Sequence, residues 1–224
     1  MPQHSAFSSA TDLAALIRSK AVTSEELVES YRARIAAHNP AINAVVYTDW
    51  DNARAQARAR DTHLARGGAC GPLHGVPMTI KEAFDIAGMP STWGLPELVD
   101  NKPSRNAVAV DRLLAAGAVI MGKTNVPRLV ADHQTFNDVY GRTNNPWDLQ
   151  RTPSGSSGGA AAALAAGLTG LELGSDIGGS IRQPSHCCGV YGHKPTLGLC
   201  STRGHDMPGD LVPLDMCVVG PMAR

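Results

Sequence analysis

Aromatic residues and a charge excess of either sign are what this sequence has least of. Phe, Trp and Tyr make up 4% of the 224 residues, so a large aromatic-lined pocket is not evident. The 20 Lys and Arg residues balance the 20 Asp and Glu residues. Because nucleic-acid-binding proteins and membrane-surface proteins need clustered basic charge, we expect neither a nucleic acid nor a membrane as a direct partner.

Long apolar runs and paired cysteines are also missing. No stretch approaches the roughly 20 apolar residues that a membrane-spanning helix needs, and the N-terminal segment MPQHSAFSSATDL lacks the charged and apolar regions of a signal peptide. The five cysteines are odd in number and form no C-x-x-C pair. These features predict a cytoplasmic protein with reduced thiols.

Several hydrolase signatures can be excluded in the same way. The sequence contains no H-E-x-x-H zinc motif and no serine three residues before a lysine. A nucleophile elbow needs glycine two residues after its serine, but Arg182 follows Ser180 at that distance. We interpret His186 and His193 as ordinary core or surface residues, and we expect no metal ion and no other cofactor.

The first forty residues predict two helices. Ser9 precedes Asp12 by three positions, as Thr23 precedes Glu26, and this is the spacing of a capping box. Apolar residues recur at helical spacing in both segments. The dipeptide Asn39-Pro40 is expected to end the second helix.

After this point the predicted elements alternate in type. The patterns predict strands over 42–48, 76–84, 118–122 and 168–174, and helices over 52–66, 107–117 and 158–167. Such alternation is typical of an α/β architecture with a largely buried sheet. No linker, repeat or low-complexity tract interrupts it, so one continuous domain is the simplest interpretation.

Residues 117–124, GAVIMGKT, match the phosphate-binding pattern G-x-x-x-x-G-K-[ST]. A phosphate-binding loop follows a strand and opens a helix. Here a predicted helix ending at Gly117 comes first, the four intervening residues resemble a strand, and Pro127 follows closely. We therefore reject the match as a phosphate-binding loop. A nucleotide-binding protein remains an alternative function, which a direct measurement of ATP binding would support.

Two clusters of serine and glycine remain. SGSSGG (154–159) opens an alanine-rich helix, and GSDIGGSIRQP (174–184) places Ser180 directly behind two glycines. A glycine-rich turn ahead of a helix allows backbone N–H groups to converge on an anion, as the oxyanion of acyl transfer requires. Taken alone, each cluster is also typical of a simple turn.

Together the two clusters closely resemble the amidase signature family, whose members cleave amide bonds with a serine–cis-serine–lysine triad. GPLHGVPMTIKEAFDIAG is similar to the family's lysine-bearing strand, AVIMGKTN to the next strand, GVYGHKPTLG to the segment beyond the nucleophile, and VVGPMAR to a later segment. The resemblance covers nearly the whole chain. It implies an α/β fold with a mixed, largely buried sheet flanked by helices, of which residues 1–224 form the N-terminal part.

The resemblance also implies a role for each matching residue. Ser180 corresponds to the nucleophile, Ser156 (24 positions earlier) to the cis-serine, and Lys81 to the base. The oxyanion hole corresponds to the backbone N–H groups of Ile177, Gly178, Gly179 and Ser180, and the supporting residues are Ser157, Ser175, Asp176 and Arg182. The chain departs from the family at Ser154, where glycine is usual, and at Ser175, where threonine is usual.

Lysine suits the role of base only when it is uncharged. Its ordinary pKa near 10.4 must fall, and burial lowers the pKa of a lysine. Lys81 lies in the apolar run 76–84, where burial is expected. From chemistry alone Lys123 and Lys194 are equal rivals, and only the resemblance selects Lys81.

The implied reaction is hydrolysis of a small-molecule carboxamide through an acyl-enzyme. Residues 201–215, STRGHDMPGDLVPLD, resemble stand-alone amidases more than the A subunits of tRNA-dependent amidotransferases, which remain an alternative. Trp93 and residues 132–140 are candidates for the pocket wall. Family members continue well beyond the GPMAR segment. We therefore expect a sheet that is incomplete at the C-terminus, a fragment or truncated product with little activity alone, and a need for the missing half or a second copy.

Overall fold

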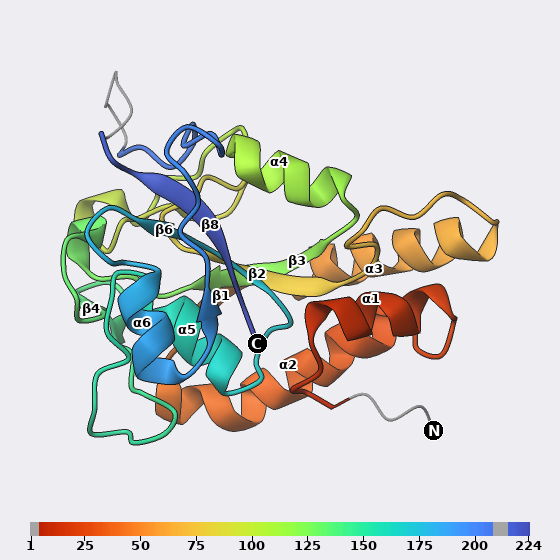
Figure 1. The fold of residues 1–224 in the computed structure, drawn as a ribbon, viewed down its shortest axis with the longest axis horizontal. Helices are drawn as coiled ribbons and strands as arrows, with labels where there is room; N and C mark the ends of the chain where they lie inside the picture. Colours follow the sequence, from red (N-terminus) through yellow and green to blue (C-terminus); the bar gives the residue numbers. More distant parts are fainter. Residues whose placement is uncertain (1–4, 208–214) are drawn as a thin grey trace.

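A six-stranded mixed sheet runs through the middle of the protein (Figure 1). The structure is a computed structural model that describes residues 5–207 and 215–224. The strand order is β1-β3-β2-β6-β8-β7, in which β3, β2 and β6 are parallel to one another and the outer pairings are antiparallel. The strands are β1 (Val45–Thr48), β2 (Pro77–Lys81), β3 (Val119–Thr124), β6 (Glu172–Asp176), β7 (Tyr191–Gly192) and β8 (Val218–Ala223). The α/β class and the mixed sheet expected from the sequence are confirmed.

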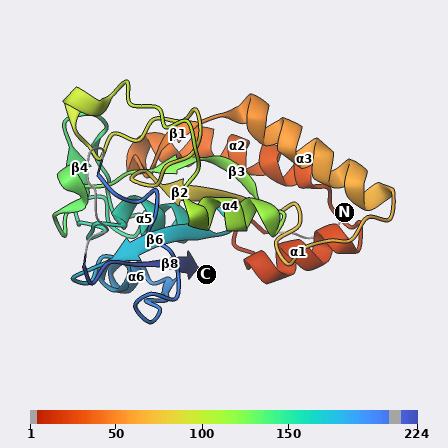
Figure 2. The ribbon, with the colours of Figure 1, turned by 90° about the horizontal axis from the view of Figure 1, so that it is seen from above.

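Helices cover both faces of this sheet (Figures 1 and 2). They are α1 (Ala10–Arg18), α2 (Ser24–Ile42), α3 (Trp50–Ala65), α4 (Val108–Ala115), α5 (Gly158–Ala165) and α6 (Arg182–Cys188). Two 3-10 turns, η1 (Pro96–Leu98) and η2 (Arg128–Val130), and a small ribbon of β4 (Phe136–Asn137) and β5 (Gly141–Arg142) complete the described elements.

Side chains of β2 alternate between the two faces of the sheet, and each face is covered by a layer of helices. Met78 and Ile80 pack with Val110 of α4 in one apolar cluster. Thr79 and Lys81 point the other way, because successive side chains of a strand face opposite sides. The small residues of α5 allow it to pack closely against that second face, and its residues from Gly158 to Leu164 are all buried.

The first two helices begin where capping chemistry predicts, but the second ends later than expected. Ser9 Oγ accepts the Asp12 N–H, and Thr23 and Glu26 form a complete capping box. The expected stop at Asn39-Pro40 is wrong, because α2 continues to Ile42 with Pro40 inside its last turn. The Asn39 side chain accepts the N–H groups of residues 44 and 45 and donates to Val45 O, so it stabilises this turn although Pro40 has no N–H to contribute.

Several predicted strand boundaries differ from those observed. The strand expected over 76–84 is β2, which ends at Lys81, where the Phe84 N–H donates to Lys81 O in a turn. The strand expected over 42–48 begins only at Val45, since Ile42 is still helical and Asn43 has a φ of 55°. The strand expected over 168–174 is β6 at Glu172–Asp176. Ahead of it, Thr169 Oγ1 accepts the Thr79 N–H, so a side chain takes the place of a backbone partner there.

The segment that matches a phosphate-binding loop is a helix end followed by a strand. Gly117 has a φ of 100° after α4, and Gly122, Lys123 and Thr124 lie within β3. The Lys123 side chain is buried and donates to Pro90 O. The order of helix and strand on which the match was rejected is therefore confirmed.

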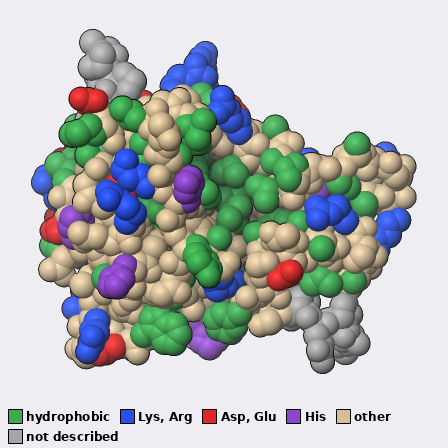
Figure 3. Space-filling view, in the orientation of Figure 1, with side chains coloured by type: hydrophobic (Ala, Val, Ile, Leu, Met, Phe, Trp, Pro, Cys, Tyr) green, Lys and Arg blue, Asp and Glu red, His purple; other side chains and the backbone are tan. Residues whose placement is uncertain are grey.

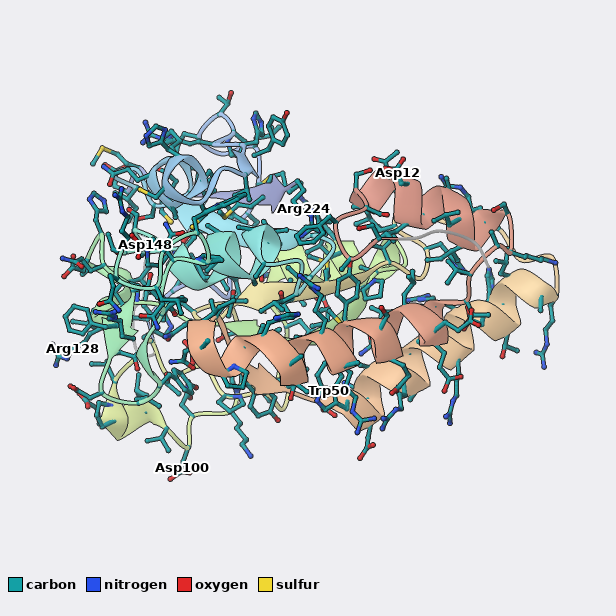
Figure 4. All side chains as sticks on the ribbon, turned by 90° about the horizontal axis from the view of Figure 1, so that it is seen from below. Asp12, Trp50, Asp100, Arg128, Asp148 and Arg224 are labelled. Atoms are coloured by element: carbon teal, nitrogen blue, oxygen red, sulfur yellow. The ribbon has the colours of Figure 1, made fainter. Side chains whose placement is uncertain are left out.

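The two ends of the described chain meet beside α1. Arg224, which follows β8, reaches the segment ahead of α1 and donates to Ala6 O and Thr169 O (Figure 4). Hydrophobic side chains gather near α4 on the face seen in Figure 3. No described helix is long and apolar enough to cross a membrane.

Candidate active site

The site lies at the carboxyl ends of the parallel strands β2 and β6. Lys81 is the last residue of β2, and Ser175 and Asp176 are the last residues of β6. Parallel neighbours end at the same edge of a sheet, which brings these polar side chains together. All three residues are buried, and Lys81 has no exposed surface.

The Lys81 amino group sits among three serine hydroxyls. Its Nζ lies 2.7 Å from Ser156 Oγ, 3.0 Å from Ser157 Oγ and 3.0 Å from Ser175 Oγ. Ser156 and Ser157 come from the loop that opens α5, and the peptide bond between Gly155 and Ser156 is cis. The structure thus brings together Lys81, the proposed cis-serine and two of the proposed supporting residues.

Burial lowers the pKa of Lys81 and so favours its uncharged form. Loss of water lowers the pKa of Lys81 to about 7, although Cys217, Asp176 and Glu172 each act to raise it. A substantial fraction of the side chain is therefore neutral at neutral pH and can accept a proton.

Ser180 lies in the turn between β6 and α6, beside the same group of hydroxyls. Its carbonyl oxygen accepts the Ser157 N–H at 3.1 Å. A cavity of about 60 Å³ is lined by Ser156, Ser175 and Ser180 together. Among the described residues, Ser180 Oγ has no hydrogen-bond partner, so its link to Ser156 is a shared cavity rather than a formed bond.

Asp176 and Arg182 hold the turn that carries Ser180. Asp176 accepts the N–H groups of Gly179 and Ile181, and it pairs with the Arg182 guanidinium through both oxygens, at 2.9 and 3.1 Å. Burial alone would raise the pKa of Asp176, but Arg182 and the backbone donors hold it well below its usual range. The carboxylate therefore stays ionised and positions the loop.

Three of the four predicted oxyanion donors are free within the described chain. The Gly179 N–H donates to Asp176 Oδ1 at 2.9 Å, whereas the N–H groups of Ile177, Gly178 and Ser180 meet no hydrogen-bond acceptor among the residues that the structure describes. Unoccupied backbone donors beside a serine suit a developing negative charge.

The rival bases lie elsewhere. Lys123 donates to Pro90 O, and burial lowers its pKa to about 8, but it contacts no serine of the site. Lys194 is partly buried, and His186 and His193 are exposed. None of these four lines the cavity beside Ser180.

The pocket walls come partly from the residues proposed for them. Trp93 lines the small cavity, and Asp132 and His133 line an adjoining open hollow of about 410 Å³ that also contains Ser180. Tyr140 instead donates to Glu82.

The sequence patterns missed four residues of the small cavity, which belong to no recognised motif: Leu129, Val130, His205 and Cys217. His205 falls in the stretch 201–215, of which residues 208–214 lie outside the described residues.

Ser154 shows the physical meaning of one departure from the family pattern. Its φ is 66°, a conformation that glycine adopts without cost and other residues rarely do.

All five cysteines are free thiols. Across residues 5–207 and 215–224, no group of three or more His, Cys, Asp or Glu side chains is placed to hold a metal ion.

Comparisons with known proteins agree with this arrangement. The chain is 46% identical to the A subunit of glutamyl-tRNA(Gln) amidotransferase from Acidothermus cellulolyticus over 195 residues, covering 87% of this chain and 39% of that protein. It is 45% identical to an acylamidase of Rhodococcus erythropolis, covering 85% of this chain and 40% of that protein. A solved bacterial aryl acylamidase of the amidase signature enzymes superposes with a TM-score of 0.90 at 33% identity, covering 97% of this chain and 45% of that one.

The chain therefore spans less than half the length of these relatives. The profile of the Amidase family matches residues 26–224. With the buried lysine, the serine loops and these matches in agreement, the chain belongs to the amidase signature family.

Proposed function

We propose that this chain carries the catalytic centre of an amidase that hydrolyses a small-molecule carboxamide to a carboxylate and ammonia or an amine. The observation that carries the proposal is the fully buried Lys81 Nζ, 2.7 Å from Ser156 Oγ, beside a cavity that Ser156 shares with Ser180. A neutral lysine, a relaying hydroxyl and a nucleophilic hydroxyl are the parts that acylation of a serine requires.

The first half of the reaction moves one proton along these groups. Neutral Lys81 takes the Ser156 proton as Ser156 takes the Ser180 proton, and Ser180 Oγ forms a bond to the carbonyl carbon of the amide. The carbonyl oxygen becomes an oxyanion, which the N–H groups of Ile177, Gly178 and Ser180 can stabilise. The proton then returns through Ser156 to the leaving nitrogen as the carbon–nitrogen bond breaks.

The second half uses water in place of the amine. The same lysine and serine take a proton from water as it attacks the ester carbonyl of the acylated Ser180, and the carboxylate leaves as Ser180 regains its proton. The chain supplies each group that this sequence requires, so we propose no cofactor.

Replacement of the nucleophile tests the proposal. We expect Ser180→Ala to abolish hydrolysis of any amide substrate and labelling by a serine-directed phosphonate, with an unchanged fold by circular dichroism. Ser156→Ala should lower turnover severely but less completely, because it removes a proton relay rather than the nucleophile. Ser104→Ala, at an exposed serine, is the matched control. Near-wild-type rates in both Ser180→Ala and Ser156→Ala would disprove the assignment.

A second function is favoured by several relatives that are A subunits of glutamyl-tRNA(Gln) amidotransferases. In that case the chain is part of one subunit of a larger enzyme, and its activity depends on partner subunits. Two assays run in parallel separate the two functions: one measures hydrolysis of glutamine, and the other measures hydrolysis of aryl or alkyl amides. Phosphonate labelling shows whether the site is intact. Failure of labelling would favour a catalytically silent product.

A further inference from the structure

His205 is a buried imidazole with a defined partner on each ring nitrogen. It is 2% exposed, and its ring stacks on Phe84 at a centroid distance of 4.1 Å and on Trp93 at 5.3 Å. Its Nδ1 lies 3.0 Å from Ala83 O, and its Nε2 lies 2.8 Å from Ser175 Oγ. The ring is therefore held in place, and it touches the hydroxyl group that contacts Lys81.

The partners determine which nitrogen carries the hydrogen. A carbonyl oxygen can only accept, so Nδ1 must be the protonated nitrogen that donates to Ala83 O. Nε2 of the neutral ring is then an acceptor, and the Ser175 hydroxyl must donate to it. Burial, with a smaller contribution from Lys81, lowers the pKa of His205 to about 3, so the ring is neutral at physiological pH.

This direction limits what Ser175 can do for Lys81. Because its one hydrogen points to His205, Ser175 Oγ can only accept a hydrogen from Lys81 Nζ, 3.0 Å away. Ser157 is limited in a similar way, since its Oγ lies 3.3 Å from Ser175 O and donates there. Ser156 is left as the hydroxyl whose hydrogen is free to point at the lone pair of uncharged Lys81.

We propose that His205 is a positioning residue that fixes the direction of the hydrogen bonds around Lys81, so that Ser156 alone donates to the unprotonated amine. The proposal rests on the proposed function, because it explains how three similar hydroxyls are reduced to one productive proton relay. His205 touches no reacting atom and acts through Ser175.

The charged surroundings lead to a measurable consequence. Lys81 faces Glu172 and Asp176 of β6 and Cys217 ahead of β8, and His205 faces Lys81 and Lys123. Within the part of the chain that the structure describes, Ser175 Oγ makes its hydrogen bonds to Lys81 and His205 and to none of these acidic or thiol groups. If the imidazole is removed, the Ser175 hydrogen becomes free to point at uncharged Lys81. The amine has one lone pair, so the Ser175 hydrogen competes there with the Ser156 hydrogen. Without His205 the buried Ser175 hydroxyl finds an acceptor in Lys81 only when Lys81 is uncharged, so Lys81 should lose its proton at a lower pH than in the wild type.

Nuclear magnetic resonance tests this without relying on turnover. In the wild type, ¹⁵N spectra of the imidazoles at neutral pH should show His205 protonated at Nδ1 and unprotonated at Nε2. In His205→Phe, which keeps an aromatic ring beside Phe84 and Trp93, the ¹³Cε titration midpoint of Lys81 should fall by roughly half to one pH unit. His205→Gln, whose amide oxygen can accept the Ser175 hydrogen, should restore the midpoint. His186→Phe, at an exposed site, is the control.

The rate of phosphonate labelling at Ser180 provides the functional measurement. It should fall roughly tenfold in His205→Phe, because the Ser175 hydrogen then displaces the Ser156 hydrogen from the lone pair of Lys81 and blocks the proton relay, and it should recover in His205→Gln. A wild-type ring protonated at Nε2, or a Lys81 midpoint unchanged in His205→Phe, would overturn the proposal. If His205→Phe fails to fold, the ¹⁵N measurement of the His205 tautomer in the wild type tests the proposal by itself. Full activity in Ser180→Ala would instead refute the proposed function and leave the tautomer measurement to be judged by itself.

Discussion

At the scale of single residues, we expect the protonation state of Lys81, the proposed base, to set the pH range in which the site works. Burial lowers the pKa of Lys81 to about 7, and only the uncharged amine accepts a proton. We therefore expect kcat/KM to rise with pH through an apparent pKa near 7, well below the value of free lysine. Lys81→Ala should lose that limb and most of the rate. A limb that persists in Lys81→Ala and disappears in His186→Ala or His193→Ala would contradict this.

Ser154 provides a second prediction at the same scale. A residue other than glycine at a φ of 66° carries a backbone cost of about 1–2 kcal/mol, which the added flexibility of glycine in the unfolded chain partly offsets. We expect Ser154→Gly to raise the free energy of unfolding by up to about 1 kcal/mol in urea titrations. Ser104, whose φ is not positive, is the control, and Ser104→Gly should lower stability. Equal losses at both positions would refute the strain argument.

At the scale of elements, the close approach of α5 to the residue after β3 places the serine loop against Lys81. Gly159 lies where an added Cβ would come within 2.4 Å of Asn125 N and 2.5 Å of Asn125 O, both backbone atoms. We expect Gly159→Ala to displace the start of α5, to lower stability by about 1–3 kcal/mol and to reduce activity, because Ser156 moves away from Lys81. Urea unfolding and an amide assay measure the two effects.

Gly178→Ala is the matched control for the packing argument. An added Cβ at Gly178 would meet nothing within 4 Å, so the free energy of unfolding should stay close to the wild-type value. If Gly159→Ala were equally neutral, the position of the serine loop would not depend on this contact.

At the scale of the whole molecule, buried acid and base make stability depend on pH. Burial raises the pKa of Glu172 to about 8, from an ordinary value of 4.5. Between these values the folded state keeps a proton that the unfolded chain has lost, so the contribution of Glu172 to stability falls as pH rises from 4.5 to 8. Lys81 acts in the opposite direction between pH 7 and 10.5, where the unfolded chain binds the additional proton.

Glu172→Gln isolates the first of these effects. The amide can still accept the Thr79 hydroxyl hydrogen but does not titrate. The difference in unfolding free energy, mutant minus wild type, should therefore become more positive from pH 4.5 to 8 and then level off. Urea unfolding at several pH values measures it, with the exposed Glu97→Gln as the control for loss of one charge. A difference that shrinks as pH rises would contradict the assignment of a protonated Glu172.

The sequence by itself determined the features that depend on neighbouring residues. Thr23 and Glu26 predicted the start of α2, and Gly117 the end of α4, because capping groups and glycine conformations act within a few residues. The alternation of strands and helices predicted the fold class. The lysine-bearing strand and two serine-glycine clusters identified the family, since their motifs are contiguous in the chain.

Only the tertiary structure decided which distant residues meet. Lys81 and Ser156 are 75 positions apart, and chemistry alone could not choose Lys81 over Lys123, which has a similar apolar setting but contacts Pro90. His205 carried no motif because its role depends on reaching Ser175 across the fold, 30 positions away. Each of these contacts joins separate elements, and packing of the whole sheet and its helices, rather than local propensity, brings such partners within hydrogen-bond distance.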